Sequence, residues 1–341
     1  MAVAPEDRDQ RIVTVRIAFL GNPGYGDLIL EELLRSNVEV VAVFSTTQRF
    51  WPRVRKRYRR YFTSRKKLFD GVQRLRERVD SVFDEQEPRE QFGRDLIAVA
   101  RGHGIRTFDG SDVVNSACHD ELRRLGVDLI LVATFGEFLP IAMLRIPKLA
   151  AINMHPSLLP KYRGGFPEFA ALLNGEREAG ITFHLMETKF DTGNILLQRR
   201  LQILEHETTI GLKRRLAALA RDTVPELLDL VRTNDLGGNP QDAAAATYCK
   251  LPTRFDCITP AMTVRQIQHL IDACHDVEDI GRPHIQIGNS RIDALSYGPA
   301  GWPFTAVDGT IHFDRVRHQH KIVAGNQLRA LARRLGIEGA T

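Results

Sequence analysis

Short apolar runs alternate with amphipathic stretches along the first two thirds of the chain. A β-branched run at 12–20 ends in a glycine-rich turn, and an apolar face at helical spacing at 28–34 precedes a second apolar run at 38–44. Strand, turn, helix and strand in this order begin a βαβ unit. Apolar runs that alternate with helices are typical of a parallel sheet covered on both faces. We therefore expect an α/β fold, with further strands at 127–134, 149–154, 181–186 and 194–203 and helices at 95–103, 121–125 and 210–232.

A second, smaller domain is expected in the last third of the chain. Gly237, Gly238 and Pro240, followed by alanines up to position 246, are typical of a linker. We therefore predict a catalytic domain over 1–236, a linker over 237–246 and a C-terminal domain over 247–341. A helix near 264–274 and short strands near 284–287, 291–296 and 310–316 indicate an α+β arrangement, for which a barrel is one alternative.

The basic residues are concentrated in one segment. The 341 residues carry 47 Lys and Arg against 42 Asp and Glu, a net charge of +5. Residues 53–67 contain nine of these cations and no acid, so the rest of the chain has 38 against 42, a net charge of −4. Apolar positions recur every three or four residues from Val54 to Phe83, which predicts a helical insertion at about 50–90. Its basic half is either a solvated face or a contact surface for phosphates, and the pattern favours neither.

Several classes of protein fit the sequence poorly. A composition of 43% hydrophobic and 26% charged residues excludes a mainly disordered chain. We expect neither a leader peptide nor a membrane span, and the four scattered cysteines predict reduced thiols in a cytoplasmic protein. No metal site is expected. Gly21, Gly24 and Gly26 follow the first strand with GxxGxG spacing, and no acid follows the second strand, which argues against dinucleotide binding.

The residues with the clearest chemistry lie in the middle of the chain. Asn153 and His155 are two apart at the carboxyl end of a predicted strand, so their side chains leave the same face. Asp191 follows the next strand in a turn that can bring its carboxylate over the same site. An amide donor, an imidazole and a carboxylate are the groups that acyl transfer to an amine requires.

The motifs around these residues resemble those of the folate-dependent formyltransferases. The resemblance rests on Asn153-x-His155-Pro-Ser-Leu-Leu-Pro-x-Tyr-Arg-Gly164 and on Asp191-Thr-Gly193, together with Phe135-Gly136-x-x-Leu139-Pro140. Within the family, the chain is similar to methionyl-tRNA formyltransferases and nucleotide-sugar N-formyltransferases. The resemblance implies a Rossmann-like catalytic domain and 10-formyltetrahydrofolate as the formyl donor.

The resemblance also implies roles for particular residues. It makes Asn153, His155 and Asp191 catalytic, and it places the donor against Phe135, Gly136, Leu139, Pro140, Met186 and Phe190. The expected contacts with the acceptor are Ser157, Lys161, Tyr162, Arg163 and Gly164, with Arg55 and Arg59 from the insertion.

The acceptor itself stays open. We expect a phosphate-bearing primary amine, such as a nucleotide-linked amino sugar, and methionyl-tRNA is the main alternative. A hydrolase of 10-formyltetrahydrofolate and a non-catalytic RNA-binding protein are further alternatives. No membrane partner is expected. The oligomeric state is left open, with a dimer as one alternative.

Overall fold

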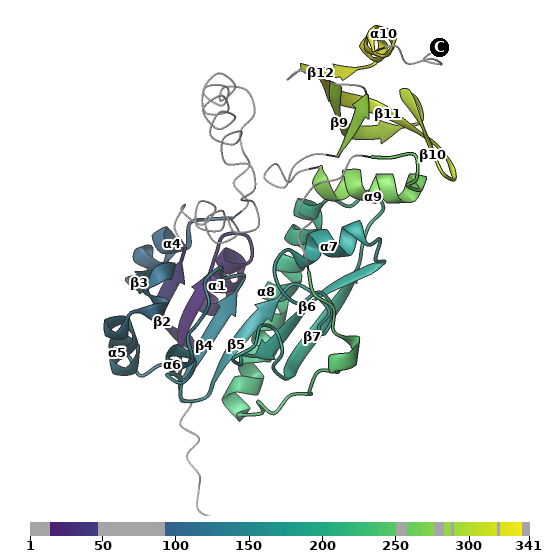
Figure 1. The fold of residues 1–341 in the computed structure, drawn as a ribbon. Helices are drawn as coiled ribbons and strands as arrows, with labels where there is room; N and C mark the ends of the chain where they lie inside the picture. Colours follow the sequence, from purple (N-terminus) through teal and green to yellow (C-terminus); the bar gives the residue numbers. More distant parts are fainter. Residues whose placement is uncertain are drawn as a thin grey trace, which may run out of the picture. The chain divides into compact units, whose positions relative to one another are not determined.

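The computed structural model describes residues 14–46, 93–249, 258–275, 283–287, 290–318 and 321–335. The predicted helical insertion, with Arg55 and Arg59, lies outside these residues. The chain divides into two compact units, Met1–Ala151 and Ile152–Thr341, which are described in turn (Figure 1). The boundaries expected from the linker composition remain a prediction.

The first unit contains the parallel strands that the apolar runs predict, β1, β2 and β4, and also β3 (Arg106–Asp109), which was not expected. Strand β1 pairs in parallel with β2 and β4, and β2 pairs in parallel with β3. Almost every residue of β1 and β4 is buried, as expected for strands covered on both faces. The elements are β1 (Val15–Gly21), α1 (Gly26–Arg35), β2 (Val38–Ser45), α4 (Leu96–Gly102), β3 (Arg106–Asp109), η1 (Gly110–Val114), α5 (Ser116–Arg124), β4 (Leu129–Ala133) and α6 (Ile141–Leu144).

The glycine-rich turn after β1 allows close packing. A Cβ added to Gly26 would lie 2.9 Å from a side-chain carbon of Leu96 and 3.3 Å from the backbone of Gly21. The adjacent Asn22 donates its side-chain amide to the carbonyl of Thr134 and accepts from the backbone N–H of Thr46. These contacts tie together the carboxyl ends of β1, β2 and β4. The glycines therefore have a packing role in this turn.

The second unit begins with an antiparallel layer. β5 (Ala150–His155) pairs with β6 (Glu178–Leu185), and β6 pairs with β7 (Ile195–Gln202), each in antiparallel fashion. The sequence predicted strands here within a mostly parallel sheet and did not specify their direction. The chain between β6 and β7 is too short for a parallel crossover, so the pair forms a hairpin. Helices α7 (Pro167–Leu173) and α8 (Thr209–Thr233) pack in this unit, α8 against β6 and β7.

The strand order of the whole sheet is β3-β2-β1-β4-β5-β6-β7. The expected α/β class with a Rossmann-like, mostly parallel sheet is confirmed, with the antiparallel strands confined to its last part.

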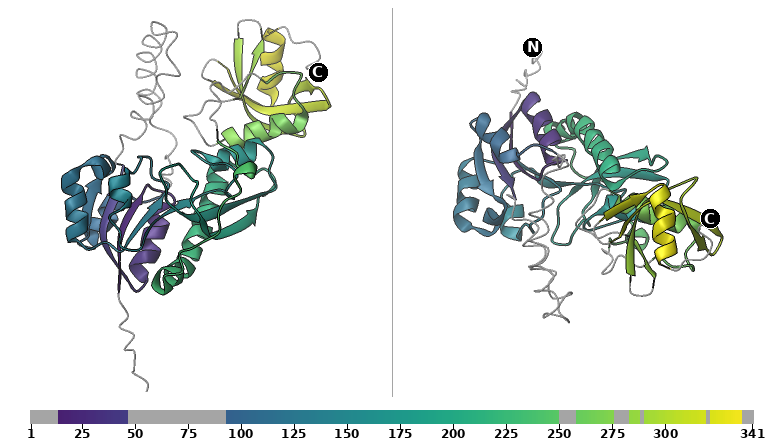
Figure 2. Two further views of the ribbon diagram at one scale, coloured as in Figure 1. Left: turned by 60° about the horizontal axis from the view of Figure 1, so that its bottom comes forward. Right: turned by 90° about the horizontal axis from the view of Figure 1, so that it is seen from above.

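The C-terminal part of the second unit is a smaller antiparallel sheet. Helix α9 (Val264–Cys274) contacts α7 and also β9 and β11 of this sheet. The strand order is β10-β11-β9-β8, with β12 beside β11 (Figure 2). The α+β character of this part is confirmed, although β10, β12 and α10 were not expected. The elements are β8 (His284–Ile287), β9 (Ser290–Gly298), β10 (Trp302–Ala306), β11 (Gly309–His318), β12 (Lys321–Ala324) and α10 (Asn326–Arg334).

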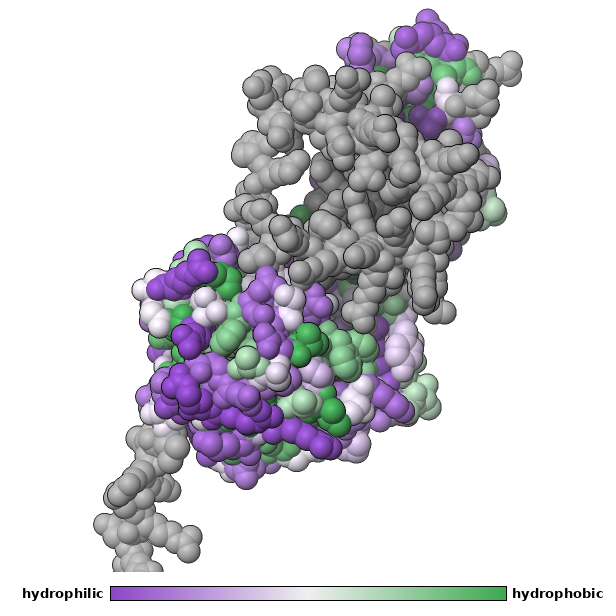
Figure 3. Space-filling view, turned by 60° about the vertical axis from the view of Figure 1, so that its left-hand side comes forward, coloured by the Kyte–Doolittle hydropathy of each residue, from purple (hydrophilic) through white to green (hydrophobic). Residues whose placement is uncertain are grey.

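Within the described ranges, no helix is both long and apolar enough to cross a membrane. Where Figure 3 shows described residues, hydrophilic side chains dominate and apolar ones are scattered among them. Scattered apolar residues of this kind are normal on a folded protein.

Candidate functional site

Strands β5 and β6 bring polar side chains together inside an apolar layer. Asn153 lies opposite His184 in the antiparallel register, and His155 lies opposite Thr182. His155 and His184 are 5% and 2% exposed. The sequence analysis missed His184, although Thr182 and His184 stand two apart in an otherwise apolar strand. Such spacing places both side chains on one face of the strand.

The carboxylate of Asp191 lies at the centre of this group. One carboxylate oxygen, Oδ2, accepts a hydrogen bond from the backbone N–H of Gly164 at 2.8 Å and lies 3.8 Å from Nδ1 of His155. The other, Oδ1, lies 3.6 Å from Nε2 of His184 and 3.5 Å from the amide nitrogen of Asn153. The structure therefore brings together the three residues that the sequence singled out.

The environment of Asp191 favours its charged form. Burial by itself raises the pKa of this carboxyl group. The charge of His155, the hydrogen bond with His184, the backbone N–H of Gly164 and the charge of His184 all lower it. The lowering effects prevail and bring the pKa from 3.8 to about 2. Asp191 is thus an ionised carboxylate at neutral pH.

The hydrogen bonds to carbonyl groups fix where the imidazole protons are. Nε2 of His155 lies 2.8 Å from the carbonyl oxygen of Tyr162, which can only accept, so this nitrogen carries a proton. Nδ1 of His155 is therefore the nitrogen directed to Asp191. By the same argument Nδ1 of His184 donates to the carbonyl of Leu185 at 2.8 Å. Nε2 of His184 lies 3.1 Å from the amide nitrogen of Asn153 and 3.6 Å from Oδ1 of Asp191, so this nitrogen faces both groups.

A loop braced by hydrogen bonds follows His155. The hydroxyl of Thr182 donates to the carbonyl of Ser157 at 2.7 Å and accepts from the N–H of Leu159 at 3.2 Å. Gln198 on β7 donates to the carbonyl of Leu159 at 2.9 Å. Ser157 is buried and donates its hydroxyl to the carbonyl of Lys161 at 2.7 Å. The loop is thus held in place before any ligand binds.

Among the residues expected to contact the acceptor, Tyr162 and Arg163 have defined partners. Tyr162 donates its hydroxyl to Glu176 at 2.7 Å, and Lys161 lies 3.4 Å from the same carboxylate oxygen. Burial first, and then Glu176, raise the pKa of Tyr162 to about 12. Arg163 is only 5% exposed, and its guanidinium donates to Gln241 and to the hydroxyl of Tyr248. The sequence analysis did not identify Gln241, because it lies in the predicted linker.

The residues expected to hold the donor lie in both units. Leu139 is buried, and Pro140 is the N-cap residue of α6 in the first unit. Phe135 lies against Gly110, where an added Cβ would be 3.2 Å from its ring. In the second unit, Met186 directly follows β6, and Phe190, 63% exposed, directly precedes Asp191. Their contact with a donor stays a prediction, as does that of Gly136 in the first unit.

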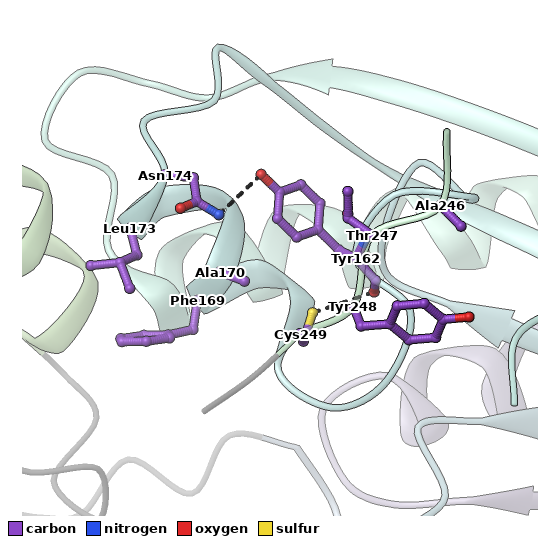
Figure 4. A pocket seen from close by; sticks show the side chains of 9 residues that line it. All are labelled: Tyr162, Phe169, Ala170, Leu173, Asn174, Ala246, Thr247, Tyr248 and Cys249. Atoms are coloured by element: carbon purple, nitrogen blue, oxygen red, sulfur yellow. Dashed lines mark hydrogen bonds between the residues drawn. The ribbon is translucent and has the colours of Figure 1, made fainter. Parts of the chain in front are cut away.

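Two open cavities lie in the second unit. The first, about 470 Å³, lies between α7 and the segment 246–249, and Figure 4 shows Tyr162, Phe169 and Tyr248 around it. Cys249 also lines it and donates its Sγ to the carbonyl of Tyr162 at 3.4 Å. Burial, Glu168 and Asp191 raise the pKa of this thiol to about 12, so it is protonated at neutral pH.

The second cavity, about 500 Å³, has a more basic lining. It lies between the end of α7 and the start of α9, and it shares Leu173 and Asn174 with the first. Arg177, Arg265 and His269 line it, and both arginines are exposed.

The fold is of the α/β class, and its strands β5 and β6 carry the buried cluster of Asn153, His155 and His184 around Asp191. The family model for the formyl transferases matches residues 15–228. The chain belongs to this family, whose members are enzymes that transfer formyl groups. The resemblance seen in the sequence is therefore confirmed.

Individual relatives show where the similarity lies. The chain is 37% identical over 185 residues to a methionyl-tRNA formyltransferase of Geobacter sulfurreducens, which covers 53% of this chain and 58% of the relative. It is 39% identical over 153 residues to a methionyl-tRNA formyltransferase of Pelobacter propionicus, a match that covers 45% of this chain and 48% of the relative. The chain thus spans about half the length of the curated relatives it matches.

The solved structures share the fold over more of the chain. WlaRD, a sugar 3N-formyl transferase solved with dTDP and 5-N-formyl-THF, has a TM-score of 0.59 at 17% identity, covering 90% of this chain and 99% of its own. An N-formyltransferase from Helicobacter canadensis, in complex with folinic acid and dTDP-3-aminofucose, also has a TM-score of 0.59 at 17% identity. The match covers 87% of this chain and 98% of that protein's chain.

Proposed function

We propose that this protein is an N-formyltransferase that moves the formyl group of 10-formyltetrahydrofolate to a primary amine. The observation that carries the proposal is the convergence of Asn153, His155 and His184 on the ionised carboxylate of Asp191. Membership of the formyl transferase family supports it.

In this proposal Asn153 and Asp191 have complementary roles. The amide of Asn153 has two N–H groups, of which one is directed to His184 at 3.1 Å, while the other makes only a long contact of 3.5 Å with Asp191. The other donates to the formyl oxygen while negative charge develops there, an interaction worth about 3 kcal/mol in comparable sites. Asp191, being ionised, accepts the proton that the attacking amine must lose.

His155 completes the proton balance. Its Nε2 proton is held by the carbonyl of Tyr162, so the nitrogen that exchanges a proton with the reacting groups is Nδ1, 3.8 Å from Asp191. The attacking amine loses one proton, and the departing nitrogen of the donor gains one. The pair of His155 and Asp191 can carry the proton from the amine to that nitrogen. The donor, when bound, supplies the formyl carbon, and the exposed ring of Phe190 next to Asp191 suits its planar ring system.

For the acceptor, we propose a phosphate-bearing amine, with a nucleotide-linked amino sugar as the first choice. Arg177 and Arg265 at the second cavity provide the cationic donors that bind phosphate, whereas burial and Arg265 lower the pKa of His269, so its imidazole is neutral there. The first cavity shares lining residues with the second and is also lined by Tyr162, whose carbonyl accepts from His155. The aromatic side chains that line the first cavity suit a sugar or base ring of the acceptor. The likeness in fold to sugar N-formyltransferases extends over both parts of the chain.

Methionyl-tRNA is the second candidate, and the sequence relatives favour it. Stretches of 185 and 153 residues are 37% and 39% identical to methionyl-tRNA formyltransferases. The basic segment at 53–67, with Arg55 and Arg59, is the part of the sequence best suited to a polyanion of this size.

The deciding experiment is mass spectrometry of the products formed from 10-formyltetrahydrofolate with a panel of amines. The panel contains charged methionyl-tRNA, nucleotide-linked amino sugars and free amino sugars. A mass gain of one formyl group on an amine supports the proposal and identifies the acceptor. Formate release without any acceptor, or no turnover at all, would refute it.

The phosphate assignment has its own test. The double variant Arg177→Gln/Arg265→Gln is expected to raise KM for a phosphate-bearing acceptor about ten-fold and to leave KM for the donor unchanged. The matched control is Arg123→Gln on α5, where the arginine pairs with exposed Asp120. Equal acceptor KM in both variants would place the phosphates elsewhere.

A further inference from the structure

The segment 239–249, called the strap below, is hydrogen-bonded to both loops of the site. Asn239 and Ile195 exchange two backbone hydrogen bonds of 2.8 Å at the turn that carries Asp191. Farther along, the carbonyl of Thr247 accepts from the N–H of Arg163 at 2.9 Å, and Cys249 donates to the carbonyl of Arg163 at 2.8 Å. The strap therefore joins the loop after β5 to the turn between β6 and β7.

Gln241 makes the side-chain connection between these two regions. Its Nε2 donates to the carbonyls of Asp191 at 2.9 Å and Gly193 at 2.8 Å. Its Oε1 accepts from Nη2 and Nε of Arg163 at 2.7 and 3.2 Å. A glutamine amide has two N–H donors and one acceptor oxygen, so this side chain uses all of its polar groups. Such a fully satisfied group has one preferred orientation.

Arg163 is placed to anchor Gln241 and not to reach a ligand in solution. It is 5% exposed, its Nη1 donates to the hydroxyl of Tyr248 at 3.2 Å, and its guanidinium lies 5.8 Å from the centre of that ring. A guanidinium with this many partners is a rigid donor. The resemblance implied that Arg163 contacts the acceptor, whereas its surroundings favour a supporting position.

The turn that Gln241 grips requires support. Asp191 has a φ of +54°, a left-handed conformation that residues other than glycine rarely adopt. Hydrogen bonds from outside the turn are what can maintain such a conformation. The two carbonyls held by Gln241 belong to this residue and to Gly193, two positions later.

We propose that Gln241, anchored by Arg163, is a positioning residue that holds the Asp191–Gly193 turn so that the carboxylate stays between His155 and His184. This inference rests on the proposed function, because it is in that function that Asp191 accepts the proton of the amine. It assigns a mechanistic task to a residue of the segment that the sequence marks only as a linker.

Two variants separate this role from a general loss of structure. Gln241→Glu keeps an oxygen for Arg163 but replaces the two N–H donors with an oxygen that faces the carbonyls of Asp191 and Gly193. Gln241→Met keeps the length of the side chain and removes every hydrogen bond. The matched control is Gln202→Ala on β7, whose amide pairs with exposed Glu178. Steady-state kinetics and thermal unfolding are measured for each variant.

We expect both Gln241 variants to lower kcat about 10- to 100-fold, the loss typical of a small displacement of a reacting group. Acceptor KM is expected to stay within about three-fold, and Gln202→Ala to match the wild type. Wild-type kcat in Gln241→Glu would overturn the proposal. A loss explained wholly by KM or by the melting temperature would also overturn it.

A second readout does not need turnover. The carboxyl carbon of Asp191 is titrated by ¹³C NMR in the wild type and in Gln241→Met. We expect its midpoint to move up from about 2 towards 3.8 by at least half a unit. An unchanged midpoint would overturn the positioning role. If the wild type formylates no amine, the proposed function fails, while this titration still decides the role of Gln241.

Discussion

The ionised state of Asp191 makes a quantitative prediction about acid stability. Its pKa is about 2 in the folded protein against an ordinary value of 3.8, a difference of nearly two units. Each unit corresponds to about 1.4 kcal/mol, so the charged carboxylate contributes about 2.5 kcal/mol to the free energy of unfolding. Because the folded pKa is the lower one, this stability is present above pH 4 and is lost as the pH falls towards 2.

The variant Asp191→Asn tests this value. Asparagine has the same shape, tolerates the left-handed φ of +54° and cannot ionise. The free energy of unfolding is measured by urea denaturation for both proteins at pH 5, 4 and 3. The difference between wild type and variant is expected to shrink by about 1 kcal/mol between pH 5 and pH 3. A difference that stays constant within about 0.3 kcal/mol would show that the histidines and Gly164 do not stabilise this charge.

Three further substitutions test the site. His155→Ala is expected to abolish formyl transfer while circular dichroism stays that of the wild type, and wild-type turnover would remove His155 from the mechanism. His184→Ala removes the imidazole that contacts both Asn153 and Asp191, so kcat is expected to fall about ten-fold, and an unchanged kcat would contradict that role. Gly193→Ala places a Cβ 1.9 Å from the carbonyl oxygen of Leu185 and is expected to cost about 3 kcal/mol in urea unfolding. Gly165→Ala, which meets no atom within 4 Å, is the control, and equal stability of the two would refute the steric argument.

The strand and helix pattern of the first unit could be predicted closely from the sequence. The apolar runs at 12–20 and 38–44 and the glycine turn between them correspond to β1, β2 and the start of α1. Such runs are informative because buried parallel strands need apolar side chains on both faces. The direction of the strands in the second unit was harder to predict from the sequence. β6 is buried like a parallel strand, whereas β7 contains two glutamines and two arginines and is mostly not buried, and the short chain between the two strands indicates a hairpin.

The candidate site was predicted only in part, because the sequence pattern shows which residues share a strand face but not which strands lie side by side. Asn153 and His155 share a strand face, a relation that the two-residue repeat of a strand makes visible in sequence. Asp191 was found because its turn directly follows the next apolar strand. His184 was missed because only the register of β5 against β6 places it opposite Asn153.

The sequence by itself therefore determined the class of fold, the family and three of the polar groups at its site, since these depend on local periodicity and on motifs. Tertiary structure alone decided which groups share a carboxylate, which imidazole nitrogen faces it and what holds the turn. Gln241 lies 50 residues from Asp191 and 78 from Arg163, yet it bonds to both. No local pattern encodes such a contact, because it exists only when the strap lies across two loops that the sheet has already placed.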